Sequence, residues 1–298
     1  MNVSIGKSTL INEAIRHWIY TSPYKIGILS LELTAAQYMI AMLSREVGYK
    51  INLIEDPQEA VNFVQQPHIV EARKHLTQTE DGESRFVLLD ERDGDLEAVK
   101  KQCELLVNKY NCKVIIIDPI QDLFEGVDMD KQNAFIKWMK IMLKKGVTFN
   151  NVCHVRKGNI STDKEGKRVL RELTEDSVHG ISAIVKSAGC NIFATRDKYE
   201  DDEIRKNVTY PTLGKARWTG VTGRINPWYY CLETHTMYDL KEYAKDNPDK
   251  IPKDFDLDYN PFEKAPKKQV SGKSSTTETV TMKVEPLEVS PKSIPEFK

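Results

Sequence analysis

The 298-residue chain lacks the features that would point to a membrane or to an oxidising compartment. No apolar run approaches the roughly 20 residues that a bilayer-spanning helix needs. No secretory signal is expected, because the N-terminus runs straight into a Gly-Lys-Ser-Thr sequence. The five cysteines are odd in number and never form Cys-x-x-Cys, which argues for reduced thiols and against a disulfide framework or a zinc site. We therefore expect a cytoplasmic protein with no membrane partner.

An excess of one charge is also missing, because 43 Lys and Arg residues face 44 Asp and Glu residues and leave a net charge of −1. The whole-chain charge therefore gives no sign of a nucleic-acid partner, although basic residues can still converge on one surface. Hydrophobic residues make up 40% of the chain and charged residues 29%, which is ordinary for a globular protein. The length fits one large α/β domain or two modest ones.

Short apolar segments alternate with segments of helical spacing along most of the chain. Strands are expected at 25–31, 85–90, 113–118, 150–155 and 190–195, helices at 10–20, 35–47, 95–109, 131–145 and 180–188, mostly helix within 50–84, and strands joined by turns at 208–240. Buried strands that alternate with helices are typical of a mostly parallel sheet. From 241 onward apolar residues are too sparse for a core. The sequence thus predicts an α/β domain over 1–240 and a flexible, largely disordered tail over 241–298.

The sequence Gly6-Lys7-Ser8-Thr9 matches the second half of Gly-x4-Gly-Lys-[Ser/Thr], a loop that cradles phosphates at the start of a helix. The first glycine of that motif would fall at Met1, so neither this glycine nor the strand expected before the loop is found. In such a loop Lys7 would contact the β- and γ-phosphates of ATP or another nucleoside triphosphate, and Ser8 would hold Mg²⁺. The alternative is a chance Gly-Lys-Ser.

Two carboxylates follow predicted strands. Asp118 ends the apolar run Val114-Ile115-Ile116-Ile117, and an aspartate in this position lies beside the metal in phosphate-loop enzymes. Alternatively, a buried strand simply finishes with a polar residue. Glu32 follows the strand at 25–31 and would reach the same sheet edge, where a carboxylate can orient the attacking water. An acidic residue that caps the next helix is the competing interpretation of Glu32.

His154 ends the strand predicted at 150–155, where it would sense the γ-phosphate, although a lone histidine at a strand end is more often structural. A basic loop follows at 156–172, and its cationic residues are Arg156, Lys157, Lys164, Lys167, Arg168 and Arg171. A loop of this kind beside a nucleotide site suits a phosphate backbone. For any one of these side chains, however, a solvated charge is the default.

Together these segments resemble the ring-shaped replicative DNA helicases of the DnaB-like class, which have a RecA-like P-loop NTPase core. The likeness is greatest to the helicase half of phage primase–helicases and to the mitochondrial Twinkle helicase. It rests on IGKSTLINE (5–13), ILSLELTAAQ (28–37), VIIIDPIQDLF (114–124), VCHVRKGN (152–159), EDSVHGISAIVKSAGCNIF (175–193) and GKARWTGVTG (214–223).

The resemblance implies a role for each matching residue. Lys7 and Ser8 would bind phosphate and Mg²⁺, Asp118 would be the second metal ligand, Glu32 the base that activates water, and His154 the γ-phosphate sensor. Lys215 and Arg217 would reach across a subunit boundary as an arginine finger. The loops at 156–168 and 178–187 would line the central channel of a ring and bind single-stranded DNA, and the resemblance implies that this ring is a hexamer.

The chain also departs from this pattern. The second channel loop has His179-Gly180-Ile181-Ser182 where Arg-x-Ser-Gly is usual, which leaves Lys186 as its basic residue. Neither a primase module nor a linker helix for a neighbouring subunit is found. Two other interpretations therefore stay open: a RecA-type recombination ATPase that does not unwind DNA, and an inactive or split-gene fragment of a helicase.

The tail at 241–298 ends in Ile294-Pro295-Glu296-Phe297-Lys298. An acidic and aromatic tip on a flexible tether could contact a primase, a DNA polymerase or a single-strand-binding protein. A passive solubilising tail is the alternative. If the chain is phage-encoded, we expect it in the cytoplasm of a bacterial host.

Overall fold

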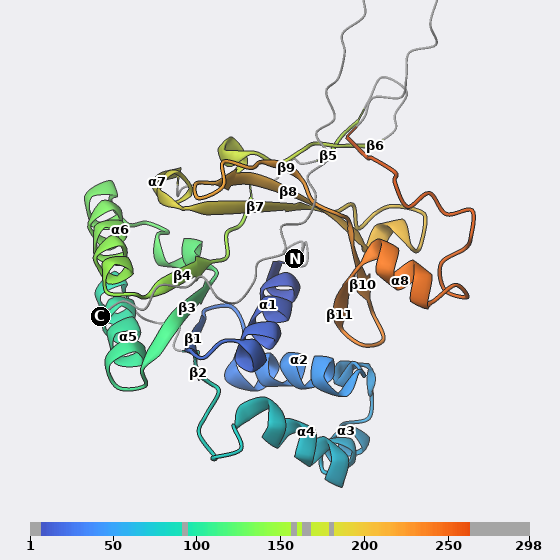
Figure 1. Cartoon of the computed structure of the whole chain (residues 1–298), viewed down its shortest axis with the longest axis horizontal. Coiled ribbons are helices and arrows are strands. Elements are labelled where there is room, and N and C mark those ends of the chain that lie inside the picture. The colour runs from blue at the N-terminus through green and yellow to red at the C-terminus, as the bar shows by residue number, and fades with distance from the viewer. Residues whose placement is uncertain (1–6, 91–94, 156–159, 163–167, 179–181, 263–298) are drawn as a thin grey trace, which may run out of the picture. The chain divides into compact units, whose positions relative to one another are not determined.

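The computed structural model describes residues 7–90, 95–155, 160–162, 168–178 and 182–262, and Figure 1 shows their arrangement. Four strands form a parallel sheet in the order β2-β1-β3-β4. They are β1 (Lys25–Ser30), β2 (Phe86–Leu89), β3 (Cys112–Asp118) and β4 (Thr148–Asn151). The predicted α/β fold with a mostly parallel central sheet flanked by helices is confirmed by this arrangement.

The side chains of strand β3 pack against hydrophobic clusters on both faces of the sheet. Ile116 packs with Ile15 and Met42 of the helices on one face, whereas Ile115 and Ile117 pack into a second hydrophobic cluster on the other. Complete burial of one such isoleucine contributes roughly 1.5–3 kcal/mol. A run of four apolar residues is therefore what a strand buried on both faces requires.

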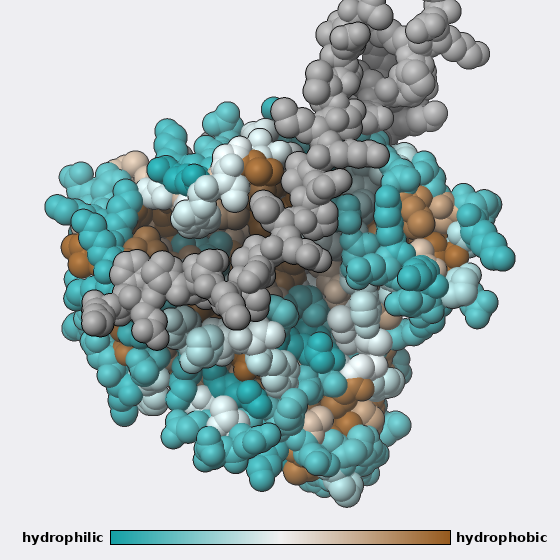
Figure 2. Space-filling model, viewed as in Figure 1, coloured by the Kyte–Doolittle hydropathy of each residue, from teal (hydrophilic) through white to brown (hydrophobic). Residues whose placement is uncertain are grey.

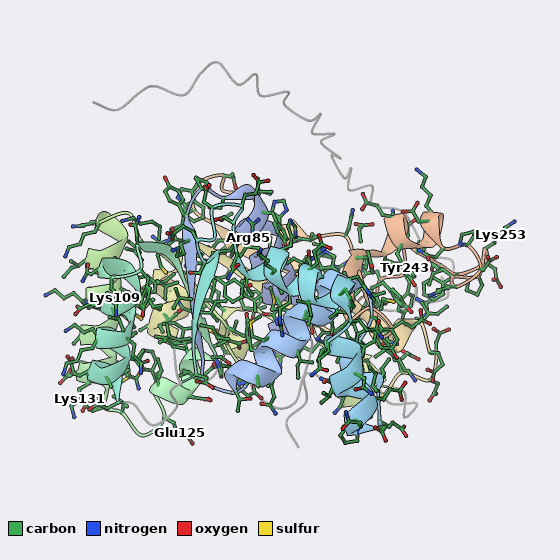
Figure 3. The ribbon with its side chains drawn as sticks, turned by 90° about the horizontal axis from the view of Figure 1, so that it is seen from below. Arg85, Lys109, Glu125, Lys131, Tyr243 and Lys253 are labelled. Carbon is green, nitrogen blue, oxygen red and sulfur yellow. The ribbon has the colours of Figure 1, made fainter. Side chains whose placement is uncertain are left out.

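Helices α1 (Lys7–Thr21) and α2 (Ala35–Val47) cover the first face, and α4 (Pro67–Thr77) packs outside α2 next to α3 (Pro57–Val64). The second face is covered by α5 (Leu96–Asn108), α6 (Met129–Lys144) and α7 (Ser182–Ser187). Figure 3 shows this α5–α6 layer, with Lys109 and Lys131 labelled on it. Short 3₁₀ helices lie at Ile51–Leu53, Ile120–Leu123, Glu175–Ser177 and Arg205–Asn207.

A second sheet is antiparallel and runs in the order β11-β10-β8-β7, with β9 also paired to β8. Its strands are β7 (Cys190–Thr195), β8 (Val208–Ala216), β9 (Gly223–Arg224), β10 (Trp228–Cys231) and β11 (Thr236–Asp239). These agree with the strands predicted at 190–195 and within 208–240. The predicted basic loop contains an antiparallel pair, β5 (Ile160–Thr162) and β6 (Arg168–Leu170).

The strand predicted over 150–155 is wrong in its extent, because β4 ends at Asn151 and His154 lies beyond it. The backbone leaves the sheet in two steps. The Val152 amide still donates to Ile117, but the Val152 carbonyl accepts from Ile120, and the backbone of His154 bonds to the side chain of Gln121. These partners replace a strand ladder, so an apolar, strand-like stretch is held as an irregular segment.

The described domain continues to Phe262, past the boundary expected at residue 240. Asp239 caps α8 (Leu240–Asp246), and Tyr243 of this helix is buried with Ile251 (Figure 3). Farther along, the Arg205 guanidinium lies 4.6 Å from the ring centre of Phe255. The apolar residues here are few, but each packs against the antiparallel sheet. The rest of the predicted tail, 263–298, lies outside the described residues.

Candidate active site

Lys7, the first residue of α1, lies at the sheet edge where β3 and β4 end. Its Nζ is 2.8 Å from Nδ1 of His154. Burial lowers the pKa of Lys7, while the charges of Asp118 and Glu32 act to raise it. The first turn of α1 has no acidic residue, so the positive end of the helix dipole adds to the lysine. The start of α1 is thus suited to an anion such as a phosphate.

Asp118, the last residue of β3, is buried and accepts a side-chain hydrogen bond from Ser8. Burial raises the pKa of Asp118 to about 6, although Ser8 and Lys7 act in the opposite direction. A carboxylate and a hydroxyl at the carboxyl edge of the sheet provide two hard oxygen ligands. Ser8 and Asp118, predicted as the metal ligands, are therefore brought together.

Glu32 follows β1 and has an exposed side chain. Its charge acts on both Lys7 and Asp118, which places it at the same edge. The helix-capping interpretation of Glu32 is wrong: Thr34 is the N-cap of α2, its side chain accepts from the Gln37 amide, and the first turn has no acidic residue. The Glu32 carboxylate is thus not committed to the helix start.

His154 is held by Gln121, which sequence reasoning did not single out. The His154 amide donates to Oε1 of Gln121 at 2.7 Å, and Nε2 of Gln121 donates to the His154 carbonyl at 2.6 Å. A lysine has only donors, so Nδ1 of His154 accepts from Lys7 and the ring is neutral with its proton on Nε2. Burial, followed by the charge of Lys7, lowers the pKa of His154 in agreement with this state.

These residues fit a magnesium–nucleotide complex. Within the described part of the chain, no three His, Cys, Asp or Glu side chains gather to hold a metal by themselves. Mg²⁺ commonly takes one or two protein oxygens together with substrate phosphates, and Asp118 and Ser8 offer such a pair. Lys7 supplies a donor for the phosphates. Thr9 follows in the first turn of α1, while Gly6 lies outside the described residues.

The family described as "DnaB-like helicase C terminal domain" matches residues 2–231. The chain belongs to this family. No curated protein matches it. A solved structure of an ATPase domain has 14% identity and a TM-score of 0.61, covering 80% of this chain and 81% of that one. A DnaB-like replicative helicase, solved to study its interactions with primase, has 14% identity and a TM-score of 0.59, covering 80% of this chain and 56% of that one.

The family agrees with the predicted RecA-like fold and supports a helicase function for this DnaB-like domain. At 14% identity the two structural likenesses show the fold alone. The finer resemblance to phage primase–helicases and to Twinkle stays a prediction. Among the described residues no helix has the length and apolar character needed to traverse a bilayer.

The predicted finger residues of the DnaB-like domain are not part of the Lys7–Asp118 group. Nζ of Lys215 donates to the carbonyls of Val185 and Lys186 at 3.3 and 3.0 Å, and it pairs with Glu175 at 3.4 Å. Nη2 of Arg217 donates to the Lys186 carbonyl at 2.8 Å. Both cations therefore bind the last turn of α7, where carbonyls lack helical partners.

The predicted DNA-binding residues are described only in part. Arg156, Lys157, Lys164 and Lys167 lie outside the described residues. Arg168 is in β6, where its backbone pairs with Thr162. Lys186 is exposed on α7 and offers its carbonyl to both finger residues. The role of these six residues in DNA binding stays a prediction.

Proposed function

We propose that this DnaB-like domain is the motor of a DNA helicase that unwinds duplex DNA by hydrolysing ATP or another nucleoside triphosphate. The observation that supports this most directly is that Lys7 and Ser8 meet His154 and Asp118 at one edge of the parallel sheet. In this proposal Lys7 binds the β- and γ-phosphates, and Ser8 and Asp118 hold Mg²⁺. When Mg²⁺ is bound, it neutralises negative charge on the phosphates.

Glu32 is the general base in this proposal. It accepts a proton from a water molecule whose oxygen bonds to the γ-phosphorus, while the bond from that phosphorus to the β–γ bridging oxygen breaks. The products are the nucleoside diphosphate and inorganic phosphate. Glu32 suits this role because its carboxylate is exposed at the site edge and serves no helix cap.

The finger residues act on a second copy of the domain. Lys215 and Arg217 bond to α7 rather than to their own Lys7 and Asp118, which agrees with a role in the site of a neighbour. A head-to-tail contact between unlike surfaces can close into a ring, and we propose a hexamer. Trp218, next to Arg217 and 80% exposed, would then be covered by the adjacent subunit.

We further propose that His154 passes the state of the γ-phosphate to the channel loops at 156–168 and 178–187. These loops would grip single-stranded DNA through Arg156, Lys157, Lys164, Lys167, Arg168 and Lys186. Binding would be largely independent of base sequence and strongly dependent on salt. Movement from 5′ to 3′ follows from the resemblance to DnaB-like helicases.

Other partners and the location of the protein are also proposals. The tail at 263–298 would contact a primase, a DNA polymerase or a single-strand-binding protein, and the domain would work in the cytoplasm of a bacterial host. Removing 265–298 should leave ATP hydrolysis unchanged. A loss of coupled synthesis with a polymerase would support the contact.

A strand-displacement assay on a forked duplex tests the proposed function. We expect Mg-ATP-dependent unwinding by the unaltered chain. Glu32→Gln should retain Mg-ATP binding but hydrolyse ATP roughly 10²–10⁴-fold more slowly, because the amide cannot accept the water proton. Binding is measured by titration and hydrolysis by phosphate release on single-stranded DNA.

Glu97→Gln is the matched control, because Glu97 is exposed on α5 and, within the described residues, pairs with Lys100 on the same helix. Its hydrolysis should equal that of the unaltered chain. DNA-stimulated hydrolysis without unwinding would instead indicate a recombination-type ATPase. Failure to bind Mg-ATP at all would indicate an inactive or split-gene fragment.

A further inference from the structure

The short connection between β1 and α2 carries Glu32, the base of the proposed reaction. It comprises residues 31–34. The Glu32 side chain is exposed, and its charge acts on Lys7, Asp118 and His154. The place of this carboxylate beside the other site residues therefore depends on how the backbone of the connection is held.

The first half of the connection is fixed to the parallel sheet. The Leu31 amide donates to the Asp118 carbonyl of β3 at 2.8 Å. The Ser30 hydroxyl, at the end of β1, donates to the Leu33 carbonyl at 2.7 Å and accepts from the Leu33 amide at 3.3 Å. Glu32 thus lies between two residues whose backbones are bound to the ends of β1 and β3.

The second half is fixed by Asp90, the residue that directly follows β2. Oδ2 of Asp90 accepts from the Ala35 amide at 2.7 Å. Ala35 is the first residue of α2, and an amide at this place has no partner within its own helix. Because β2 runs parallel to β1 with Leu89 beside Leu29, Asp90 lies at the same edge of the sheet as Glu32.

The charge of Asp90 also suits the start of α2. The first turn of this helix contains no acidic residue, and its N-cap, Thr34, accepts from the Gln37 amide rather than from the Ala35 amide. A carboxylate is favoured at the positive end of a helix dipole, and here it comes from a neighbouring strand. The surface over the start of α2 is largely hydrophilic in Figure 2, in agreement with the exposed Asp90.

We propose that Asp90 is a positioning residue for ATP hydrolysis: it binds the Ala35 amide and thereby sets the place of Glu32 beside the attacking water. The inference rests on the proposed role of Glu32 as the base. Asp90 takes no proton itself, and its effect passes through the start of α2. Displacement of a reacting group by about 1 Å can lower a rate roughly 10²-fold, so one hydrogen bond at this place has a large expected effect.

Two changes of Asp90 test the hydrogen bond from its acceptor side. Asp90→Ala should lower kcat for ATP hydrolysis roughly 10–10²-fold, because residues 31–34 lose their link to β2. Mg-ATP binding should stay the same, since Lys7 and Asp118 are unchanged. Asp90→Asn keeps a side-chain oxygen that accepts from Ala35, so it should recover most of the lost rate. Phosphate release at saturating Mg-ATP on single-stranded DNA gives kcat, and titration gives binding.

Ala35→Pro tests the same bond from its donor side. Proline has no amide hydrogen and is well tolerated as the first residue of a helix. Thr34 is extended, with φ −68° and ψ 158°, which is the conformation that a residue before proline favours. We expect the same loss of kcat as in Asp90→Ala, with Mg-ATP binding retained. Normal hydrolysis by Ala35→Pro would overturn the proposal, because Asp90 would then act by a route other than the α2 amide.

Combination with Glu32→Gln shows whether Asp90 acts through the base. If it does, Asp90→Ala should cause no further loss in the Glu32→Gln chain, because effects that pass through one catalytic group are not additive. An equal loss in both backgrounds would contradict the positioning of Glu32. Asp56→Ala is the matched control, because Asp56 caps α3 by accepting from the Glu59 amide at 2.8 Å, and α3 packs beside α4. Its hydrolysis should equal that of the unaltered chain.

Hydrogen exchange of the Ala35 amide in the nucleotide-free protein is a measurement that needs no hydrolysis. Exchange should be at least roughly tenfold faster in Asp90→Ala than in the unaltered chain, and close to the unaltered rate in Asp90→Asn. Equal exchange in all three forms, or fast exchange with normal hydrolysis, would overturn the positioning role while Glu32 remains the base. Normal hydrolysis by Glu32→Gln would instead refute the base itself and with it the proposed mechanism.

Discussion

Arg217→Ala is expected to lower ATP hydrolysis by roughly 10³-fold or more while Mg-ATP binding is retained, because an arginine finger acts on charge that develops during phosphoryl transfer. Among the described residues of its own protomer, the Arg217 guanidinium donates a hydrogen bond to the Lys186 carbonyl at the end of α7. Truncation therefore removes a surface cation and leaves the Lys7–Asp118 group of the same chain untouched.

Hydrolysis on single-stranded DNA measures this effect, and assembly is followed separately. Trp218 is 80% exposed in the single chain, so its fluorescence should shift to the blue when a neighbour covers it. Arg217→Ala should keep this shift if only the chemistry is lost. Arg73→Ala, an exposed arginine on α4, is the matched control and should hydrolyse ATP normally.

Mixing two inactive variants tests whether the finger acts between subunits. A ring of Arg217→Ala and Glu32→Gln subunits contains some interfaces in which an intact Arg217 faces an intact Glu32. Such mixtures should recover part of the hydrolysis that both parent proteins lack. Normal hydrolysis by Arg217→Ala alone, or no recovery in any mixture, would refute the assignment of Arg217 as a finger.

The sequence indicated three of the four central strands, β1, β2 and β3, because each of them contains an apolar run, whereas β4 is mostly polar. The run ending in Asp118 and the strand at 25–31 appear almost where they were predicted, and only the sheet order had to come from the structure. The strand predicted around His154 was wrong in extent because the backbone of His154 bonds to Gln121, a partner 33 residues away. No local pattern reveals a side chain that substitutes for a strand ladder.

The predicted boundary at residue 240 was misplaced for a related reason. A handful of aromatic residues is too few to form a core alone, but Tyr243 and Phe255 complete one that the antiparallel sheet begins.

The meeting of Lys7, Ser8 and Asp118 could be expected from the sequence, because the carboxyl ends of parallel strands lie at one edge of the sheet, whereas the roles of these residues stay predictions. Gln121 was missed even though it stands three residues after Asp118, since its role depends on the position of His154.

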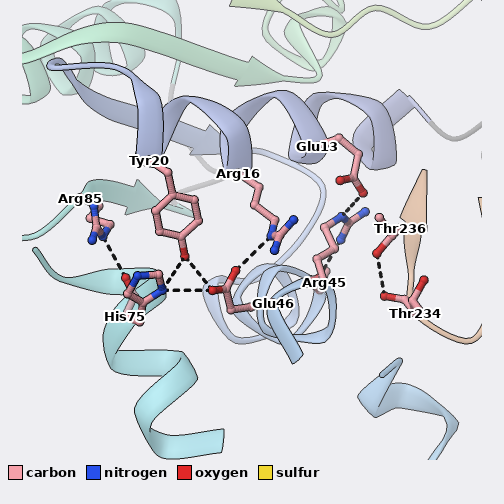
Figure 4. Close-up of polar contacts among 10 residues, drawn as sticks. Glu13, Arg16, Tyr20, Arg45, Glu46, His75, Arg85, Thr234 and Thr236 are labelled. Carbon is pink, nitrogen blue, oxygen red and sulfur yellow. Dashed lines mark hydrogen bonds and ion pairs between the residues drawn. The ribbon is translucent and has the colours of Figure 1, made fainter. Parts of the chain in front are cut away.

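The fold around the site depends on a buried ion pair shown in Figure 4. Nε of Arg45 on α2 donates to Oε1 of Glu13 on α1 at 3.0 Å, and the side chains are 0% and 18% exposed. The same carboxylate accepts from the Met237 amide of β11. Burial lowers the pKa of Arg45 and raises that of Glu13 against their mutual attraction. The pair thus joins α1, which presents Lys7, to α2 and to the second sheet.

Arg45→Met is expected to destabilise the domain by about 3–5 kcal/mol, because it leaves the Glu13 carboxylate largely buried without its counter-charge. Adding Glu13→Gln should restore most of that loss, since the amide oxygen still accepts from the Met237 amide while the unpaired charge is gone. Urea unfolding measures both. Lys131→Met breaks a solvent-exposed pair with Asp128 at the start of α6, whose side chains are 76% and 56% exposed, and should lower the free energy of unfolding far less. If the double variant were as unstable as Arg45→Met, packing of the arginine stem rather than the buried charge would hold α1 in place.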